Sequence, residues 1–229
     1  MFRDKYRNED YFEKRLQFNV KTFYEFEELK KDVLEERLSY FYLSQLGYSN
    51  KLLTISYSLG KSPDDIFKWF KISLHYFELF YETYGSTYDL IDYFSLAVLF
   101  EDRKEEFIED IEKVFQKYMT FVDAGDQLQD DFIDFLGVYL LQGDVVNFHS
   151  HLEYLNLMGD TVESVIEAQK FWYYAHSEAF WYNSHLRDTE SYYGYWSFDT
   201  AALCKIRGIY DERFKDMDFF PYDLLVQEE

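Results

Sequence analysis

Residues that interrupt helices are scarce in this chain, and this scarcity limits its fold more than any other feature. Only two prolines, Pro63 and Pro221, and nine glycines punctuate the 229 residues. In the long intervals between them, apolar residues recur at steps of three and four, which is typical of amphipathic helices. No segment shows the alternation of a strand. We therefore predict an all-α fold, a helical bundle or stacked helical hairpins with about eight to ten helices and no significant sheet.

Glycines, prolines and capping residues indicate where the helices begin and end. We predict a first helix from Glu9 to Leu46 that ends at Gly47, and a shorter one over 51–59. The run Ser62-Pro63-Asp64-Asp65 has the composition of a helix start, with a cap, a first-turn proline and two acids. The helix that this run opens is expected to continue towards Gly85. Further helices are expected from a cap at Ser86 or Thr87 to Val98, and over 103–118, 128–139, 145–158, 161–177 and 197–207.

The strongest internal break is the sequence Asp123-Ala124-Gly125-Asp126. It predicts an N-terminal helical domain over 1–122 and a C-terminal helical domain over 123–229, joined in one compact body. A chain of this length buries roughly 70% of its unfolded surface. The 24 Phe, 23 Tyr and 4 Trp supply a dense aromatic core, with many tyrosine hydroxyls expected at its boundary.

The net charge of −21 is distributed unevenly along the chain. Residues 1–46 hold 9 Lys and Arg against 10 Asp and Glu, whereas residues 72–169 hold 4 against 21. Such a field repels nucleic acid and anionic membranes and attracts a basic partner, although it also serves solubility alone. It opposes self-association except through a neutral face such as the N-terminal helix, so the oligomeric state stays open.

One group of acids suggests a binding face. Asp126, Asp130 and Asp134 are spaced i, i+4 and i+8, which would place them on one side of a helix. Together with Asp123, they are our candidate residues for contacting a basic protein.

The single cysteine, Cys204, excludes an intrachain disulfide and a cysteine-based zinc site, as suits a reducing cytoplasm. It lies in an apolar helix, which favours a packed thiol although Lys205 and Arg207 are near. The N-terminus lacks the apolar segment of a signal peptide. The longest stretch without a charged residue, 38–50, is shorter than the roughly 20 residues of a membrane span. We therefore expect a cytoplasmic protein.

The histidines do not indicate a catalytic or metal site. His149 and Glu153 are spaced i, i+4, but a metal needs at least a third ligand. Ser184 and His185 are adjacent, which is unusual for a nucleophile and its base, and no nucleophile-elbow motif surrounds them. A structural role for His185 beside the aromatic residues is favoured. We predict no catalytic residue, no cofactor and no metal, and hence no enzyme.

The C-terminal part of the chain carries a series of aromatic motifs. They comprise Trp172-Tyr173, Trp181-Tyr182-Asn183-Ser184-His185, Tyr193-Gly194-Tyr195-Trp196-Ser197-Phe198, Ala201-Ala202-Leu203 and Pro221-Tyr222-Asp223-Leu224. In order and spacing they resemble the C-terminal domain of the PoNi-type immunity proteins. The segment from Arg3 to Lys14 is similar to the start of that family's N-terminal domain. Asn183 stands where we expect the family often to carry an acid.

The resemblance implies an all-helical, non-enzymatic bacterial protein that binds a cognate DNase toxin of the PoNe class in competition between cells. The hypothesis is stoichiometric occlusion of the nuclease through the acidic surface of 72–169. Two alternatives remain, an acidic helical adaptor for another basic protein and a small enzyme that uses His149 or His185.

We expect the C-terminal motif to act as a structural clasp. Ser197 would cap a helix that ends at Gly208, and this helix would turn Phe198, Ala202 and Ile206 inward. Trp196 and the cluster 219–222 would then close over it as buried side chains.

Overall fold

The computed structural model describes residues 1–81, 87–187 and 189–226, and every regular element within these ranges is a helix. This confirms the all-α prediction. The chain divides into two compact units. Unit 1 comprises Met1–Tyr84 and Asn183–Tyr195, and unit 2 comprises Gly85–Tyr182 and Trp196–Glu229. The division of the sequence at 122 and 123 does not coincide with these units and stays a prediction about family domains.

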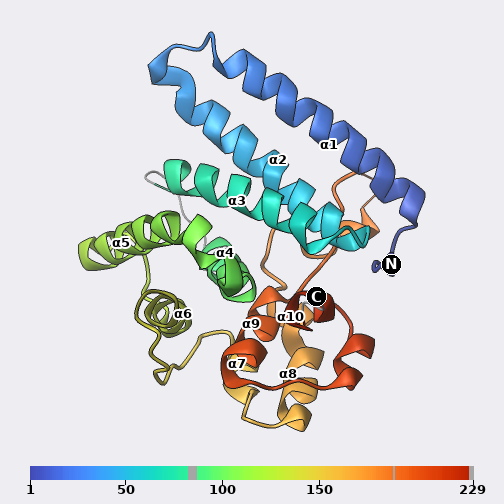
Figure 1. Cartoon of the computed structure of the whole chain (residues 1–229), viewed down its shortest axis with the longest axis vertical. Helices are drawn as coiled ribbons and strands as arrows, with labels where there is room; N and C mark the ends of the chain where they lie inside the picture. The colour runs from blue at the N-terminus through green and yellow to red at the C-terminus, as the bar shows by residue number, and fades with distance from the viewer. Residues whose placement is uncertain (82–86, 188, 227–229) are drawn as a thin grey trace. The chain divides into compact units, whose positions relative to one another are not determined.

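Unit 1 is built on three helices, α1 (Glu9–Lys30), α2 (Leu38–Ser58) and α3 (Pro63–Phe80). Helix α1 packs against α2 and α2 against α3 (Figure 1). Aromatic rings fill the space between them. The ring of Phe23 lies edge-on to Trp69 at 5.4 Å, and Phe26 contacts Phe41 and Tyr48 at 5.8 and 5.6 Å.

The prediction of one long helix from Glu9 to Leu46 is wrong. Helix α1 ends at Lys30, the chain turns, and a short 3-10 helix, η1 (Glu35–Arg37), leads into α2. Gly47 does not end a helix either, because α2 continues through it to Ser58. The turn brings Phe26 of α1 against Phe41 of α2, so two apolar stripes bury one another, which a single straight helix cannot do.

The predicted start of α3 is confirmed. The Ser62 hydroxyl accepts a hydrogen bond of 3.2 Å from the Asp65 amide, and Pro63 is the first helical residue. This satisfies an amide that has no partner within the helix, while proline lacks the amide that would need one. Of the two caps suggested for the next helix, Ser86 lies outside the described residues, and the helix begins at Thr87.

Unit 2 contains the remaining α-helices. They are α4 (Thr87–Leu99), α5 (Ile108–Ala124), α6 (Asp131–Gln142), α7 (Glu153–Leu157), α8 (Val162–Ala175), α9 (Phe198–Arg207) and α10 (Tyr222–Val226). Helix α4 is buried along most of its length and packs against α6 and α9 (Figure 1). It is apolar on nearly all sides, as expected of a helix inside a core.

Three further expectations in unit 2 are settled. The helix expected over 103–118 begins later, because 101–106 form a 3-10 helix (η2, Glu101–Glu106), and α5 then runs to Gly125. The prediction of a helix over 145–158 is wrong, since only α7 (Glu153–Leu157) is helical in this range. The start at Thr161 is confirmed by a capping box with Ser164.

No helix among the described residues is both long and apolar enough to cross a membrane.

A side chain explains part of the failure at 145–158. The Asn156 amide group donates to the Ser150 carbonyl at 2.6 Å, and its oxygen accepts from the Ser150 amide at 2.9 Å. Such local bonds give the backbone an alternative to the helical pattern.

Candidate functional site

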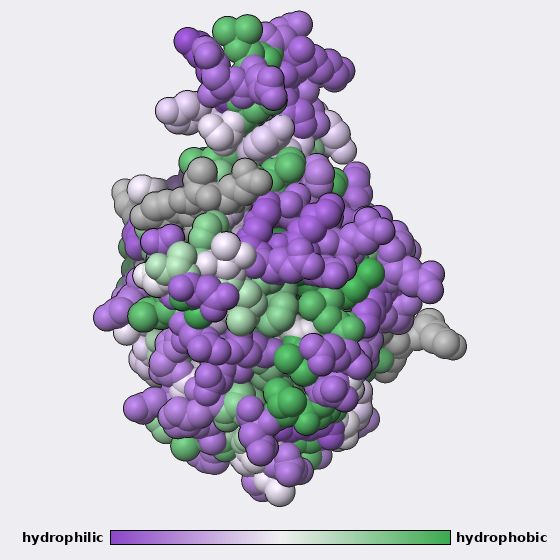
Figure 2. All heavy atoms as spheres, turned by 90° about the vertical axis from the view of Figure 1, so that its left-hand side faces the viewer, coloured by the Kyte–Doolittle hydropathy of each residue, from purple (hydrophilic) through white to green (hydrophobic). Residues whose placement is uncertain are grey.

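The excess negative charge belongs almost entirely to unit 2. Unit 1 contains 14 Lys and Arg against 16 Asp and Glu, a net charge of −2, whereas unit 2 contains 9 against 28, a net charge of −19. Hydrophilic residues predominate on the face drawn in Figure 2, with smaller apolar groups between them. The charge asymmetry along the sequence therefore becomes an asymmetry between two compact bodies.

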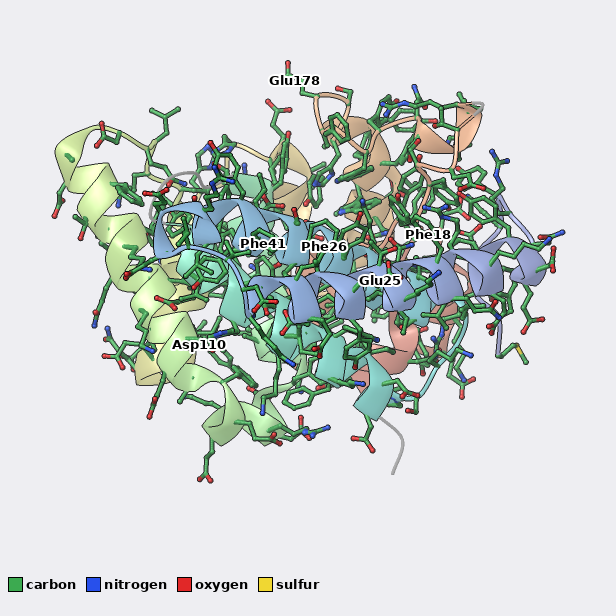
Figure 3. The ribbon with its side chains drawn as sticks, turned by 90° about the horizontal axis from the view of Figure 1, so that it is seen from above. Phe18, Glu25, Phe26, Phe41, Asp110 and Glu178 are labelled. Atoms are coloured by element: carbon green, nitrogen blue, oxygen red, sulfur yellow. The ribbon has the colours of Figure 1, made fainter. Side chains whose placement is uncertain are left out.

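The outer face of α5 carries several exposed acids. Glu109, Glu112 and Asp123 are exposed on it, and Glu105 is exposed in the 3-10 helix just before it. The spacings of three and eleven residues keep Glu109, Glu112 and Asp123 on one side of α5. Asp110, labelled on this helix in Figure 3, lies 3.7 Å from the Lys113 ammonium.

Four cations lie near these acids in the sequence: Arg103, Lys104, Lys113 and Lys117. In the described ranges, however, no Lys or Arg forms an ion pair with Glu105, Glu109 or Glu112. Glu109 and Glu112 are neighbours of like sign on the surface of α5, three residues apart.

The predicted helical face of Asp126, Asp130 and Asp134 is wrong. Helix α6 begins only at Asp131, so Asp126 and Asp130 precede it. Asp123 lies in the last turn of α5, and Asp123 and Asp126 are both exposed. Gly125, in the left-handed conformation with φ 79°, ends α5 between them and breaks the periodicity.

Asp130 is a buried helix cap with an exposed fraction of 1%. Its Oδ1 accepts hydrogen bonds from the amides of Phe132 at 2.7 Å and Ile133 at 3.2 Å. Its own amide donates to the Tyr118 hydroxyl at 2.7 Å, and its Oδ2 lies 2.8 Å from Nδ1 of His151. This carboxylate is therefore engaged in holding α6.

Asp134 is half-buried in the first turn of α6, and its Oδ2 accepts a hydrogen bond of 2.6 Å from Gln129. Desolvation raises the pKa of this carboxyl, against the lowering effect of the hydrogen bonds. Of the four predicted residues, Asp123 and Asp126 thus present their carboxylates most openly. Toxin binding by all four stays a proposal.

The C-terminal aromatic motif is divided between the two units. Residues 183–195 belong to unit 1, whereas residues 172–182 and the residues from Trp196 onward belong to unit 2. Asn183 and Gly194 adopt positive φ values of 58° and 106°. Glycine and asparagine tolerate this left-handed half of backbone space better than other residues do.

In unit 1, His185 packs among aromatic side chains, as expected. Its ring stacks on Tyr6 with centroids 4.0 Å apart, and its Nδ1 lies 3.0 Å from the Tyr195 hydroxyl. The Ser184 hydroxyl is also 3.0 Å from that hydroxyl. Desolvation lowers the pKa of His185. Ser184 and His185 thus share Tyr195 as a partner, which is a packing arrangement rather than that of a nucleophile and its base.

In unit 2, a buried polar network surrounds the start of α9. Asp199 is 1% exposed, and its two oxygens accept hydrogen bonds from Trp172 and Tyr154. Burial raises the pKa of the Asp199 carboxyl, while its coulombic interaction with His176 opposes the rise. Asp92 lies near enough to repel it. This cluster joins α4, α7, α8 and α9.

The clasp predicted around α9 is confirmed in part. Gly208 ends the helix with φ 66°, and Phe198 and Ala202 are buried. Ser197 is the N-cap residue but makes no capping bond, because its hydroxyl donates to the Phe219 carbonyl at 3.2 Å. Trp196 and Ile206 are only half-buried, contrary to expectation.

The other motif residues pack as rings or begin α10. Trp181 stacks on Trp172 with centroids 5.5 Å apart, and Tyr182 contacts Tyr173 at 4.7 Å. Pro221 is buried, while Tyr222 and Asp223 open α10, half-buried and exposed respectively.

The two remaining candidates for a reactive or metal-binding side chain are Cys204 and His149. Cys204 is fully buried, and desolvation raises its pKa to about 12, so it is a packed thiol. His149 is exposed outside any helix, which removes the i, i+4 geometry with Glu153. In the part of the chain that the structure describes, no three His, Cys, Asp or Glu side chains are grouped as metal ligands.

These features define a protein that is helical throughout its described elements and whose excess negative charge lies mostly in unit 2. Two family descriptions match the chain: "PoNe immunity protein (PoNi), N-terminal" over residues 3–112 and "PoNe immunity proteins (PoNi), C-terminal" over residues 128–224. The chain belongs to the PoNe immunity proteins. No curated protein and no solved structure is significantly similar to it.

Proposed function

We propose that this protein binds a cognate PoNe-class nuclease in a stoichiometric complex and covers the surface with which that nuclease grips DNA. The family to which the chain belongs supports the nature of the partner. The net charge of −19 on unit 2 is the observation that supports the mode of binding. The complex forms in the cytoplasm of the bacterium, where the DNA to be protected lies.

The physical reason is complementarity of charge. A nuclease that holds phosphates needs cations at its DNA-binding surface. Carboxylates on the inhibitor attract that surface over a long range, which raises the association rate and disfavours partners of the wrong sign. The same field repels DNA, so the inhibitor does not bind the substrate of the nuclease.

We assign the main electrostatic role to the α5 face, formed by Glu105, Glu109, Glu112 and Asp123. Asp126 extends it beyond the end of the helix. Asp134 contributes at its edge, and Asp130 adds charge from a buried position.

Exposed aromatic residues of α8 offer anchors for the same partner. Phe171 and Tyr174 are 52% and 68% exposed and lie three residues apart, on one side of the helix. Glu178, labelled in Figure 3, follows them and is also exposed. Buried aromatic anchors supply much of the affinity in protein interfaces, whereas charges mainly govern the association rate.

The function is tested by co-expression with the cognate PoNe-class nuclease. We expect the wild-type protein to rescue growth and to inhibit the purified nuclease at a ratio of one to one. An adaptor for another basic protein would not protect the cell. A double variant His149→Ala/His185→Ala should still inhibit, because no catalytic step is involved, and loss of inhibition with an intact fold would favour an enzyme.

The binding surface is tested by charge reversal. The triple variant Glu105→Lys/Glu109→Lys/Glu112→Lys should slow association at low salt by at least about tenfold and reduce its salt dependence. The matched control is Asp32→Lys/Glu35→Lys/Glu36→Lys, which makes the same change in net charge on exposed positions of unit 1. Equal effects of the two variants would exclude the α5 face and leave only a non-specific effect of charge.

A further inference from the structure

The outer surface of α1 exposes large apolar side chains. Phe18, Tyr24 and Leu29 are 53%, 48% and 58% exposed. Their spacing places Phe18 and Leu29 on one flank, and Tyr24 on the other flank, of the side opposite the buried Phe12 and Phe23. Figure 3 labels Phe18 and Glu25 on this helix. A shallow depression of about 630 Å³ runs along it, lined by Lys21, Tyr24, Glu25, Glu28 and Leu29. Exposed apolar side chains that stand beside charged ones around such a depression are typical of an interaction surface.

The charges on the same face are mixed along its length. Lys14 pairs with Asp10 near the start of α1, Lys31 pairs with Glu28 at its end, and Lys21 precedes Glu25 by one turn near the middle. Their partners within the chain are close in sequence, as in the 3.7 Å pair of Lys21 and Glu25. The side chains in these pairs are 58–76% exposed, so the pairs contribute little to stability and can exchange partners.

We propose that this face of α1 binds a second copy of the same chain, with the two α1 helices packed antiparallel. A twofold axis near Tyr24 would place Phe18 against Leu29 of the second copy and Lys21 against Glu25 of the second copy. The pair of Lys21 and Glu25 is centred on Phe23, and the pair of Phe18 and Leu29 is centred between Phe23 and Tyr24, so one axis serves both. In such an isologous interface each contact occurs twice, so Lys21 and Glu25 of the two copies complement each other.

The distribution of charge favours a second copy over a basic partner at this face. Unit 1 has a net charge of only −2, whereas two copies that meet through unit 2 each bring −19. A strongly basic protein would be drawn to unit 2 for the same reason. The near-neutral α1 face is therefore where two copies meet with least repulsion. This inference does not depend on the proposed inhibition of a nuclease.

The experiment is sedimentation equilibrium of the full chain, from about 1 to about 200 µM at near-physiological salt, because mass action makes dimerisation depend on concentration. We expect the weight-average mass to rise from 28.0 kDa towards twice that value. A mass of 28.0 kDa at every concentration overturns the proposal.

Variants test the orientation of the helices. Lys21→Glu should weaken self-association at least about tenfold, and adding Glu25→Lys should restore it, because the exchanged charges again face each other. Phe18→Glu should weaken it similarly, whereas Leu128→Glu, at an 85% exposed position of unit 2, should not. Circular dichroism should confirm that each variant is folded.

Two results would count against this arrangement. If the charge swap fails to restore the dimer, the antiparallel pairing is wrong. If Phe18→Glu abolishes nuclease binding and leaves the mass unchanged, the face belongs to the nuclease instead.

Discussion

The indole Nε1 of Trp172 donates a hydrogen bond of 3.1 Å to Oδ1 of Asp199, which joins α8 to the first turn of α9. Trp172 is 3% exposed and Asp199 is 1% exposed. The other oxygen of Asp199 accepts from the Tyr154 hydroxyl of α7. A buried carboxylate is costly unless its hydrogen bonds are made, so this group ties three helices of unit 2 together.

Trp172→Phe removes the donor to Asp199 and keeps most of the ring. We expect a loss of about 1–3 kcal/mol in the free energy of unfolding, because a buried acceptor then lacks a partner. The matched control is Trp196→Phe, at a half-buried position, which should cost less. Urea denaturation followed by circular dichroism measures both, and equal losses would show that the Asp199 bond contributes nothing specific.

Asp89→Asn tests a pH dependence of stability. Desolvation raises the pKa of Asp89, in the first turn of α4, from 3.8 to about 6 in the folded protein. The folded state therefore holds this proton more tightly. Its contribution to stability is fully present below pH 3.8 and is lost as the pH rises through about 6.

The variant should thus be more stable than the wild type by about 1–2 kcal/mol at neutral pH, and the difference should vanish in acid. Burial also raises the pKa of Asp92, so part of the pH dependence should persist. Thermal unfolding across this pH range measures the effect. Asp64→Asn, in the exposed first turn of α3, is the control, and a stabilisation of the same size there would contradict the explanation.

Asp130→Ala should destabilise the protein by about 1–2 kcal/mol, because the amides of Phe132 and Ile133 lose their acceptor. Asp130→Asn keeps an acceptor oxygen at this position and should cost less. Asp123→Ala, at an exposed position, should change stability by less than about 0.5 kcal/mol. Thermal unfolding separates the three. If Asp130→Ala weakens nuclease binding without a loss of stability, the residue acts at the interface rather than as a cap.

Two glycine-to-alanine substitutions should change the free energy of unfolding in opposite directions. Gly47 lies inside α2 with open space where a Cβ would stand, so Gly47→Ala should stabilise by about 0.5–1 kcal/mol. Gly208 ends α9 at φ 66°, a conformation unfavourable for alanine, so Gly208→Ala should destabilise by about 1 kcal/mol. Chemical denaturation measures both, and stabilisation by Gly208→Ala would contradict the assigned role of its backbone.

The sequence alone was enough for the fold class and for the starts of α1, α3, α4, α8 and α9. Apolar spacing and local capping act within a few residues, so the cap at Ser62, the box at Thr161 and the end at Gly208 could be predicted from their neighbours. The same local reasoning failed at Gly47, because an open helix position tolerates glycine when packing elsewhere stabilises the helix.

The hairpin of α1 and α2, the burial of Asp130 and the division of the aromatic motif at Tyr195 were decided by tertiary structure. Each depends on contacts between residues far apart in the chain, such as the Tyr192 hydroxyl with Asp4 in unit 1. Spacing along a helix cannot show which of its acids a distant element will bury. The sequence therefore determined how much negative charge the protein carries, and only the packing decided which carboxylates are free to meet a partner.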